Sequence, residues 1–382
     1  MTQPGAGLNV AICGAGMISA LHRRGALLAG ATVRGVLASS PARSAEVAAD
    51  WGVTGYPDLA AVLADDTVDV VHIATPNATH HRFALDALAA GKHVVCEKPL
   101  GLDLAQAKEM AVAAEASDRV ATVPFVYRFH AIIRELRARV QAGEFGAWNL
   151  IHGSYLQDWM LSPEVATWRT DPAQGGASRA FGDIGSHWID LVEWVAGVRF
   201  TELVAATSIA IPQRPSGSAA AFSGEGGGDL VDVTTEDSAI LMLRDSNGLL
   251  ANATISQLSA GRKNRLWFEL DGAQKSAVFD QEQPEFAWLG GETGFDRLAR
   301  DAGLGSEDVA RLSKIPSGHA QGYADAFDAF VADTYAAARG EWREGLPTFV
   351  DGLRTAAVTA TVLESAAAGA WTPIPTFTAE EN

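Results

Sequence analysis

The segment LNVAICGAGMISALH (8–22) decides the fold, because it joins an apolar run to a helical pattern through two glycines. The apolar run predicts a buried strand, Gly14 permits a tight turn, and Gly16 lets the backbone approach a ligand closely. The helix N-terminus that follows offers free N–H groups and a partial positive charge to a pyrophosphate. Ser19 stands where the third glycine of this fingerprint is usual. We therefore expect dinucleotide binding here, with Met17 and Ile18 beside the cofactor.

The same alternation of strand and helix continues to residue 124. Val- and Ile-rich runs predict strands, and amphipathic patterns predict helices between them. Continuous apolar strands suit a parallel sheet that is buried on both faces and has right-handed crossovers. The expected strands are 8–13, 32–38, 68–74, 93–97 and 120–125, and the expected helices are 17–29, 41–51, 78–90 (capped by Asn77) and 103–117. The sequence thus predicts a Rossmann domain over residues 1–123.

After residue 124 the pattern changes to consecutive strands, which imply an antiparallel or mixed sheet. The expected strands are 147–158, 200–211, 231–243, 249–258 and 265–279, the expected helices are 131–142, 323–339 and 350–368, and 212–230 and 283–322 are expected to be irregular, with a short helix near 296–303. The prediction is an α/β fold whose second domain, 124–382, carries a large, mostly antiparallel open sheet. Its open face is the expected surface for a homodimer or homotetramer, and the active site is expected between the domains.

Composition argues against several classes of protein. The chain carries 29 Lys and Arg against 46 Asp and Glu, so no nucleic-acid partner is expected. No apolar run reaches the length of a membrane span, so no membrane partner is expected. Cys13 and Cys96 are too few for a disulfide framework, which favours the cytoplasm. Arg23-Arg24 followed by GALLAGATV resembles a twin-arginine export signal, but cleavage there would remove the glycine turn.

Three further motifs follow the glycine turn in a fixed order. ATPNATHH (74–81) ends the third expected strand, AGKHVVCEKPLG (90–101) contains Glu97-Lys98-Pro99, and GDIGSHWIDLVEW (182–194) contains Asp183 and His187. This ordered set resembles the glucose–fructose oxidoreductase/inositol dehydrogenase (Gfo/Idh/MocA) family, over essentially the whole chain. YLQDW (155–159) and Trp168-Arg169 most resemble the pyranoside dehydrogenases of that family.

The resemblance implies catalytic roles for Lys98, Asp183 and His187, and elementary chemistry supports those roles. Oxidation of a carbinol removes a hydride from carbon and a proton from oxygen, so it needs a base whose pKa is near neutrality. His187 is such a group, and Asp183, one helical turn earlier, is placed to orient the imidazole. Lys98 follows the carboxyl end of a parallel strand, where open α/β sheets bind ligands. We expect His187 as the base and Lys98 as the stabiliser of the developing alkoxide, and no metal, since no cluster completes four zinc ligands.

Further residues are expected to contact the cofactor or the substrate. The nicotinamide half of the cofactor should pass Thr75, Pro76, Asn77 and His80, together with Glu97, Lys98 and Arg128. Substrate contacts are expected from Tyr127, Gln157, Asp158, Trp159, Arg169 and His319. Strand alternation points Gln157 and Trp159 one way and Asp158 the other, so these three cannot all face one ligand.

The end of the second expected strand bears on the choice between NAD and NADP. NAD-preferring Rossmann domains place an acidic residue there to bind the ribose 2′-hydroxyl. VLASSPAR (36–43) instead places Ser39 and Ser40 at that point, with Arg43 close by and Glu46 as the first acid after the strand. We therefore expect NAD(P) as the cofactor, with NADP accepted.

The motifs together predict an NAD(P)-dependent dehydrogenase that oxidises a secondary hydroxyl of a neutral sugar, anhydrosugar or cyclitol. One alternative is the reverse reaction, an NADPH-dependent reductase of ketosugars or imines. Another is a dinucleotide-binding regulator without catalysis, against which the presence of Lys98, Asp183 and His187 argues. The residues alone leave the exact polyol and the physiological direction open.

Overall fold

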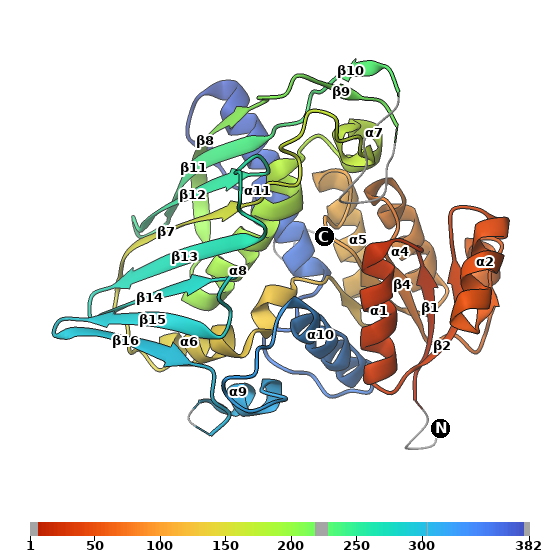
Figure 1. Cartoon of the computed structure of the whole chain (residues 1–382), viewed down its shortest axis with the longest axis horizontal. Coiled ribbons are helices and arrows are strands. Elements are labelled where there is room, and N and C mark those ends of the chain that lie inside the picture. The colour runs from red at the N-terminus through yellow and green to blue at the C-terminus, as the bar shows by residue number, and fades with distance from the viewer. Residues whose placement is uncertain (1–6, 218–227, 304, 378–382) are drawn as a thin grey trace. The chain divides into compact units, whose positions relative to one another are not determined.

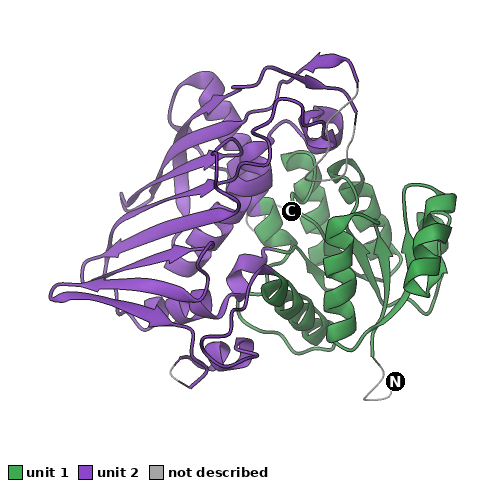
Figure 2. Cartoon of the chain, in the orientation of Figure 1, with its two compact units in different colours: residues 1–124, 324–353 green, residues 125–323, 354–382 purple. Residues whose placement is uncertain are grey.

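The structure, a computed structural model, describes residues 7–217, 228–303 and 305–377. Contacts divide the chain into one unit of residues 1–124 and 324–353 and another of residues 125–323 and 354–382 (Figure 2). This differs from the two consecutive domains that we expected, because the chain returns to the first unit through most of a helix near its C-terminal end. Phe327 on that helix packs edge-on against His22, and Thr334 hydrogen-bonds Thr122.

The first unit contains a six-stranded parallel sheet in the order β3-β2-β1-β4-β5-β6 (Figure 1). Its strands are β1 (Asn9–Cys13), β2 (Thr32–Leu37), β3 (Thr54–Gly55), β4 (Val70–Ile73), β5 (His93–Cys96) and β6 (Ala121–Thr122). The helices of this unit are α1 (Met17–Leu28), α2 (Pro41–Trp51), α3 (Leu59–Leu63), α4 (His80–Ala89), α5 (Leu104–Ala116) and most of α10 (Tyr323–Ala338). β1 and β4 are buried almost throughout, as their continuous apolar runs predict. The Rossmann fold is confirmed.

The second unit contains a nine-stranded, mostly antiparallel sheet in the order β16-β15-β14-β13-β7-β12-β11-β8-β17 (Figure 1). Its strands are β7 (Trp148–Leu156), β8 (Phe200–Ser208), β11 (Ser238–Asp245), β12 (Leu250–Ser256), β13 (Arg265–Gly272), β14 (Lys275–Asp280), β15 (Phe286–Gly291), β16 (Gly294–Ala299) and β17 (Thr372–Pro373). A separate antiparallel pair is formed by β9 (Gln213–Pro215) and β10 (Leu230–Asp232). β12 pairs with β7 in parallel, and the large sheet is otherwise antiparallel over the described residues. The second half of the predicted fold is thus confirmed.

Helices cover one face of this large sheet and leave side chains of the other face exposed. The main helices are α6 (Ala131–Gln141), α8 (Ser186–Ala196) and α11 (Phe349–Ala368), with short segments α7 (Pro172–Gly175) and α9 (Glu307–Leu312). Trp188 of α8 donates its indole N–H to the backbone oxygen of Trp267 in β13 at 3.0 Å. On the other face Ile240 and Met242 of β11 are 59% and 51% exposed. Alternation along β11 therefore separates a buried face from an open one.

Several sequence-based expectations were wrong in detail. Segment 265–279 is not one strand but two, β13 and β14, joined by a tight turn. Segment 283–322 contains the hairpin β15–β16 in place of a helix near 296–303, and the short helix lies at α9. The expected loop 212–230 includes β9 and reaches β10, while 218–227 lies outside the described residues. Asn77 begins a 3₁₀ turn, Asn77–Thr79, and Thr79 is the residue that precedes α4.

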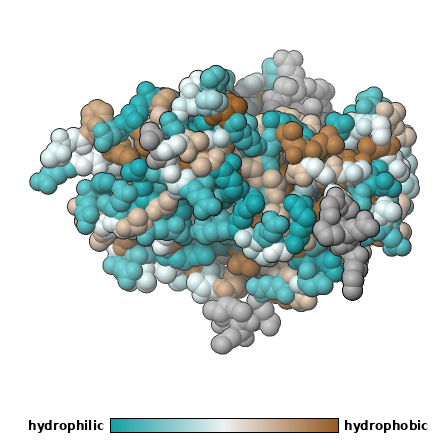
Figure 3. Space-filling view, turned by 90° about the horizontal axis from the view of Figure 1, so that it is seen from below, coloured by the Kyte–Doolittle hydropathy of each residue, from teal (hydrophilic) through white to brown (hydrophobic). Residues whose placement is uncertain are grey.

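One face of the surface shows the polar character expected of a strongly charged chain. Seen from below, the visible face is mostly hydrophilic, with smaller apolar areas among the polar residues (Figure 3). Acidic residues outnumber basic ones by 17 in the whole sequence. Among the described residues, none of the helices combines the length and the apolar character that crossing a bilayer requires.

Candidate active site

The glycine turn of the first unit has the geometry that a dinucleotide needs. Gly14 has a φ of +121°, and a Cβ at this position would lie 2.3 Å from the backbone oxygen of Ala74. Gly16 precedes α1 without any side-chain cap, and a Cβ there would meet nothing within 4 Å. This twelve-residue helix therefore begins without a side-chain cap and with open space beside Gly16, which fits the pyrophosphate of a dinucleotide. Met17 is exposed in the first turn of this helix, and Ile18 is half-buried.

The residues expected near the ribose lie at the start of α2. Ser39 is exposed, and the Ser40 hydroxyl accepts a hydrogen bond from the Arg43 backbone N–H at 3.2 Å. The Arg43 guanidinium contacts Glu46 at 2.6 Å, and both side chains are largely exposed. An exposed ion pair of this kind is weak, so Arg43 can exchange Glu46 for a phosphate at little cost.

His80 links the two motif segments of the first unit. Its Nδ1 lies 2.9 Å from the backbone oxygen of Pro99, and its Nε2 lies 2.9 Å from that of Thr75. Burial lowers the pKa of this imidazole, although the two carbonyl contacts act in the opposite direction. A neutral ring can donate to one of these oxygens at a time. The ring therefore lies between the backbone oxygens of Pro99, which follows Lys98, and Thr75, which follows β4. Its contact with the nicotinamide stays a prediction.

Glu97 ends a buried run of polar groups that crosses the first unit. Its Oε1 lies 3.1 Å from Nε2 of His22, whose Nδ1 lies 2.8 Å from Nδ1 of His72. Nε2 of His72 lies 2.9 Å from the hydroxyl of Tyr335. Burial would raise the pKa of Glu97, but the hydrogen bond from His22 and the charge of Lys98 lower it overall.

One set of tautomers satisfies every contact in this run. A Glu97 carboxylate can only accept, so His22 donates from Nε2, and a neutral His22 ring then accepts at Nδ1. His72 then donates from Nδ1 and accepts the Tyr335 hydroxyl proton at Nε2. Burial and the neighbouring His22 hold the pKa of His72 well below its usual value, which agrees with a neutral ring. The other Glu97 oxygen accepts the Lys98 backbone N–H at 3.2 Å, so the run supports the segment that carries the candidate lysine.

Removing the donor at the far end of this run should destabilise the fold. Tyr335→Phe leaves Nε2 of His72 buried without its hydrogen bond, so the free energy of unfolding should fall by about 1–3 kcal/mol. Urea unfolding measures this loss. Tyr56→Phe is a matched control, because the Tyr56 hydroxyl bonds Asp65, whose carboxylate is partly exposed and can be hydrated instead. Equal losses in both variants would contradict a stabilising role for the buried hydrogen bond between Tyr335 and His72.

In the second unit, His187 lies within a group of aromatic rings. The ring centroids of Tyr127, Phe125 and Tyr155 lie 5.0, 5.6 and 6.4 Å from that of the imidazole. His187 is 5% exposed and lies near the start of α8. The first two rings approach edge-on, so they fix the plane of the imidazole.

Polar groups continue from this aromatic group into a connected run. The hydroxyls of Tyr127 and Tyr155 lie 2.6 Å apart, and Tyr155 donates to Oδ1 of Asn264 at 2.6 Å. The same oxygen accepts from Nε2 of Gln157 at 2.9 Å, and Oε1 of Gln157 accepts the Trp159 indole N–H at 3.0 Å. Burial, partly offset by hydrogen bonds to Tyr155 and Asn264, raises the pKa of Tyr127 to about 12. The run therefore consists of neutral donors and acceptors, which suit a polyol.

Asp183 lies in a π-helical turn, Phe181–Gly185, that leads directly into α8. Its Oδ2 accepts a hydrogen bond from Nε2 of Gln257 at 2.8 Å, and its Oδ1 lies 3.9 Å from Nε of Arg169. The Arg169 guanidinium in turn lies over the rings of Trp168 and Trp159, at 4.5 and 5.7 Å from their centroids. Arg169 thus connects the candidate acid to the candidate substrate residues. π turns of this kind occur frequently at functional sites.

Three other predicted site residues have different surroundings. Arg128 is buried and forms a two-point ion pair with Asp190, and its Nε–Oδ2 distance is 2.9 Å. Asp158 accepts from Lys263 at 2.7 Å and from the Gly261 backbone at 3.0 Å, which lowers its pKa. The His319 side chain is exposed, and its backbone oxygen accepts from Arg300 at 2.7 Å. Their contacts with cofactor or substrate stay predictions.

Sequence reasoning missed three residues of this cluster. Tyr155 precedes Gln157 by two positions, so strand alternation places both side chains on the same face and could have indicated Tyr155 as a site residue. Gln257 and Asn264 follow β12 and precede β13, and only the register of the sheet brings them beside segment 155–159. Among the described residues, His152, Glu269 and Asp271 form one group of potential metal ligands, with their ligand atoms within 4.8 Å of one another. The prediction of no metal therefore stays a prediction.

Comparisons with known proteins agree with both units. Residues 8–125 match a family model described as an oxidoreductase family with an NAD-binding Rossmann fold, and residues 133–278 match the GFO/IDH/MocA C-terminal domain. Levoglucosan dehydrogenase from Pseudarthrobacter phenanthrenivorans is 32% identical, with 91% of each chain covered. A solved levoglucosan dehydrogenase in complex with NADH and levoglucosan has a TM-score of 0.87 at 28% identity, covering 97% of this chain and 100% of that one. An inositol dehydrogenase homologue with NAD⁺ from Azotobacter vinelandii has a TM-score of 0.86 at 25% identity, covering 97% and 98%.

Proposed function

Because this chain belongs to the GFO/IDH/MocA family of oxidoreductases, we propose that it oxidises a secondary hydroxyl of a neutral sugar, anhydrosugar or cyclitol. The observation that carries the proposal is the surroundings of His187, where buried aromatic rings meet a run of neutral hydroxyl and amide groups. Such a lining binds ring faces and hydroxyls. Relatives named levoglucosan dehydrogenase and inositol 2-dehydrogenase support the same substrate class.

Three residues have separate roles in the proposed reaction. A bound nicotinamide supplies the hydride acceptor. His187 takes the hydroxyl proton onto a ring nitrogen, and the neighbouring aromatic rings keep the imidazole in one orientation. The negatively charged carboxylate of Asp183 stabilises the resulting imidazolium. The Lys98 ammonium donates to the substrate oxygen and stabilises the negative charge that develops on it.

Charge in the cluster favours a neutral substrate over a phosphorylated one. A phosphate is usually held by several Arg or Lys donors. In the second unit Arg128 is ion-paired with Asp190, and Arg169 lies beside Asp183 and stacks on tryptophan. We expect kcat/KM to be at least about tenfold higher for the best neutral sugar or cyclitol than for its phosphate ester, a difference of about 1.4 kcal/mol.

The test is to follow the absorbance of the reduced nicotinamide with matched neutral and phosphorylated polyols. Turnover of neutral compounds is the expected result. Preference for the phosphate esters would contradict the substrate class, and absence of turnover with every compound, despite tight cofactor binding, would favour a binding protein without catalysis.

For the cofactor, we propose that NADP is accepted alongside NAD. Ser39 is exposed where NAD-preferring domains carry an acid, and Arg43 can exchange Glu46 for a 2′-phosphate. Ser39→Asp should shift the ratio of kcat/KM for NAD over NADP upward by about tenfold or more, because a carboxylate accepts from the 2′-hydroxyl and repels the phosphate. Ser39→Asn, which adds no charge, is the matched control. Rejection of NADP by the unmodified protein would contradict this assignment.

We also propose a homodimer or homotetramer formed through the open face of the large sheet. Ile240, Met242 and Leu250 are between 50% and 59% exposed on neighbouring strands of the described structure. Contiguous exposed apolar residues of this kind favour association. Ile240→Lys should lower the oligomer size measured by light scattering. For location we propose the cytoplasm, since Cys13 and Cys96 are both free and buried.

A further inference from the structure

Gln257 connects Asp183 to a buried network of charges in the second unit. Its amide lies between two groups of opposite charge, with Oε1 3.1 Å from Nη1 of Arg179 and Nε2 2.8 Å from Oδ2 of Asp183. Gln257 and the Arg179 side chain are both 0% exposed. Solvent does not reach the Gln257 amide, so its orientation has a large effect on both neighbours.

Arg179 determines which end of the amide faces Asp183. A guanidinium can only donate, so the atom of Gln257 that faces it must be the oxygen. The amide nitrogen then faces Asp183 and donates, so Oδ2 of Asp183 must accept. A proton on that oxygen would place two donors against each other.

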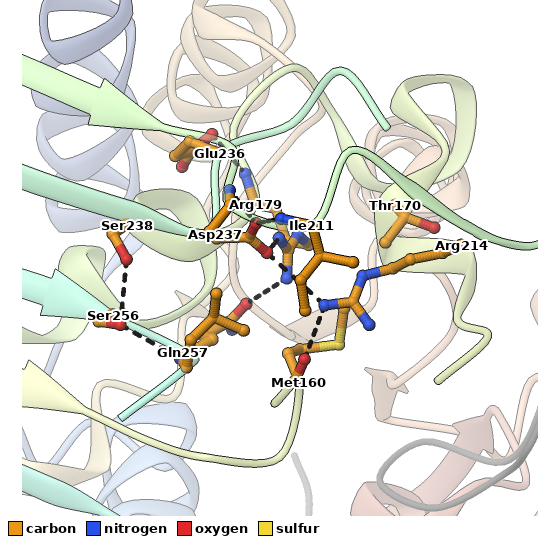
Figure 4. A network of polar contacts seen from close by, with 12 residues as sticks. Met160, Thr170, Arg179, Ile211, Arg214, Glu236, Asp237, Ser238, Ser256 and Gln257 are labelled. Atoms are coloured by element: carbon orange, nitrogen blue, oxygen red, sulfur yellow. Dashed lines mark hydrogen bonds and ion pairs between the residues drawn. The ribbon is translucent and has the colours of Figure 1, made fainter. Parts of the chain in front are cut away.

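Arg179 is itself fixed from the far side by Asp237. Arg179 forms an ion pair with Oδ1 of Asp237, while Oδ2 accepts the backbone N–H groups of Ala210 and Ile211 at 2.8 and 3.0 Å. Arg214 lies 3.7 Å from the same carboxylate and donates to the backbone oxygen of Met160 at 2.6 Å. Figure 4 shows this run of contacts from Gln257 through Arg179 and Asp237 to Arg214. Its charges alternate in sign and, with Asp183 included, sum to zero.

Backbone contacts hold the same network in place. The Gln257 N–H donates to the Asp237 oxygen at 3.1 Å, and the Asp183 N–H donates to the Arg179 oxygen at 2.8 Å. Both oxygens of the Glu236 carboxylate accept backbone N–H groups, one from Phe181 at the start of the π turn at 2.8 Å and one from Arg179, two residues earlier, at 3.1 Å. Neither Gln257 nor Asp183 can move far without breaking buried hydrogen bonds.

We propose that Gln257 is a positioning residue, oriented by Arg179, which keeps Asp183 as a hydrogen-bond-accepting carboxylate during the reaction. The part that concerns the reaction rests on the proposed function, in which Asp183 stabilises the protonated His187. Neither Gln257 nor Arg179 contacts the substrate in this account.

The charged and titratable groups around Asp183 are consistent with an ionised Asp183 carboxylate. Arg169, on the segment 168–170, lies 3.9 Å from the other carboxylate oxygen. The charge of Asp183 is among the smaller causes, after burial, that raise the pKa values of Tyr127 and Tyr155. His187 follows on the same helical segment, and Glu236 and Asp237 face Arg179 from the other side.

Gln257→Glu tests the arrangement, because it replaces the donor by a group that donates only when protonated. Its protonated carboxyl can still accept from Arg179 and donate to Asp183, whereas its ionised form faces Asp183 with a like charge. Burial and the Asp183 charge then raise the pKa of the introduced carboxyl in the folded protein above its unfolded value of about 4.3, because Asp237 already balances the Arg179 charge that acts in the opposite direction. A carboxyl with a raised pKa costs no stability below the unfolded pKa, and its cost grows as the pH rises towards the folded pKa. The Tm deficit of the variant should therefore widen by about 3 °C or more between about pH 5 and pH 8.

A second substitution isolates the pair. In the double variant Gln257→Glu/Asp183→Asn, the new carboxylate accepts from both Arg179 and the introduced amide, so the widening of the Tm deficit should disappear. The same widening in both backgrounds would overturn the proposed hydrogen bond. This comparison of Tm values requires no enzymatic activity. It therefore tests the hydrogen bond even if the wild-type protein turns over no polyol and the proposed function fails.

Kinetics then test the positioning role. The ratio of kcat/KM between Gln257→Glu and wild type should fall by about tenfold or more from about pH 6 to about pH 9, while the cofactor Kd stays constant. Gln281→Glu, another buried glutamine of the same unit that lies outside the cluster, should give a flat ratio. A flat ratio for Gln257→Glu, with the Tm cycle as expected, would overturn the positioning role and leave a purely structural hydrogen bond.

Discussion

Replacement of Lys98 by methionine is expected to lower kcat by about 10²-fold or more, because the ammonium that stabilises the developing alkoxide is lost. Methionine keeps the length and most of the apolar stem of lysine, so the change isolates the charge and its N–H donors. The glycine turn at Gly14 and Gly16 is untouched, and the Kd for the nicotinamide cofactor should change much less than kcat. Steady-state kinetics and fluorescence titration of the reduced cofactor measure the two quantities.

Lys314→Met serves as the matched control, since Lys314 is exposed in the second unit and has no proposed role. Its kcat should stay within about twofold of wild type. Near-normal turnover in Lys98→Met would remove the lysine from the mechanism. A tenfold or larger increase in cofactor Kd without a change in kcat would assign Lys98 to cofactor binding alone.

Replacement of His187 by alanine is expected to lower kcat by about 10²–10⁴-fold, since the proton of the reacting hydroxyl then has no positioned acceptor. The imidazole is buried against Phe125, Tyr127 and Tyr155, so alanine also leaves a cavity. His187→Gln fills more of that space without restoring a base near neutral pKa. It should be as inactive as His187→Ala while unfolding at a temperature closer to that of wild type.

His81→Ala is the control for histidine removal, because His81 is partly exposed and pairs with Glu109 at 2.7 Å on the surface of the first unit. Its kcat should be unchanged. Recovery of turnover in His187→Gln, in parallel with recovery of Tm, would show that His187 acts through packing, and the base would have to be sought elsewhere.

Local pattern was sufficient to predict most elements of the first unit. The strands and helices from 8 to 117 have strong signals, such as Val/Ile-rich runs, Gly52 and Gly91 after helices, and the glycine turn. β3 and α3 were missed because a two-residue strand and a five-residue helix are too short to show a period. The return of α10 to this unit depends on contacts more than 200 residues apart in sequence, such as that of Thr122 with Thr334, which no local pattern encodes.

The second unit was harder because hairpin strands and helices compete for the same short patterns. A short helix was expected near 296–303, yet Gly294–Ala299 is a strand that pairs with Phe286–Gly291 through register that only the folded sheet supplies. The candidate site divides in the same way. Asp183 and His187 lie in one motif and were predictable together, whereas Gln257 and Asn264 carry ordinary amides whose importance comes from their partners, Arg179 and Tyr155.

The residues that the sequence predicted to contact the cofactor fall into two groups in the structure, one buried and hydrogen-bonded to the protein and one exposed. His80 and Arg128 were expected at the cofactor, and in the structure both make strong contacts with the protein itself, His80 with two backbone oxygens and Arg128 with Asp190. A buried side chain that is already hydrogen-bonded gains less from a ligand than an exposed one. Ser39 and Gly16, which are exposed, are the stronger candidates for direct cofactor contact.

The central claim is that this protein moves a hydride from a secondary ring carbon of a neutral polyol to a nicotinamide. The most direct test uses the best substrate of the polyol panel, deuterated at the carbon to be oxidised, with analysis of the reduced cofactor by mass spectrometry. We predict that each reduced nicotinamide carries one deuterium from the substrate and that Lys98→Met and His187→Ala form this labelled cofactor far more slowly. Reduced cofactor without deuterium, or deuterium released into water, would contradict the proposed hydride transfer.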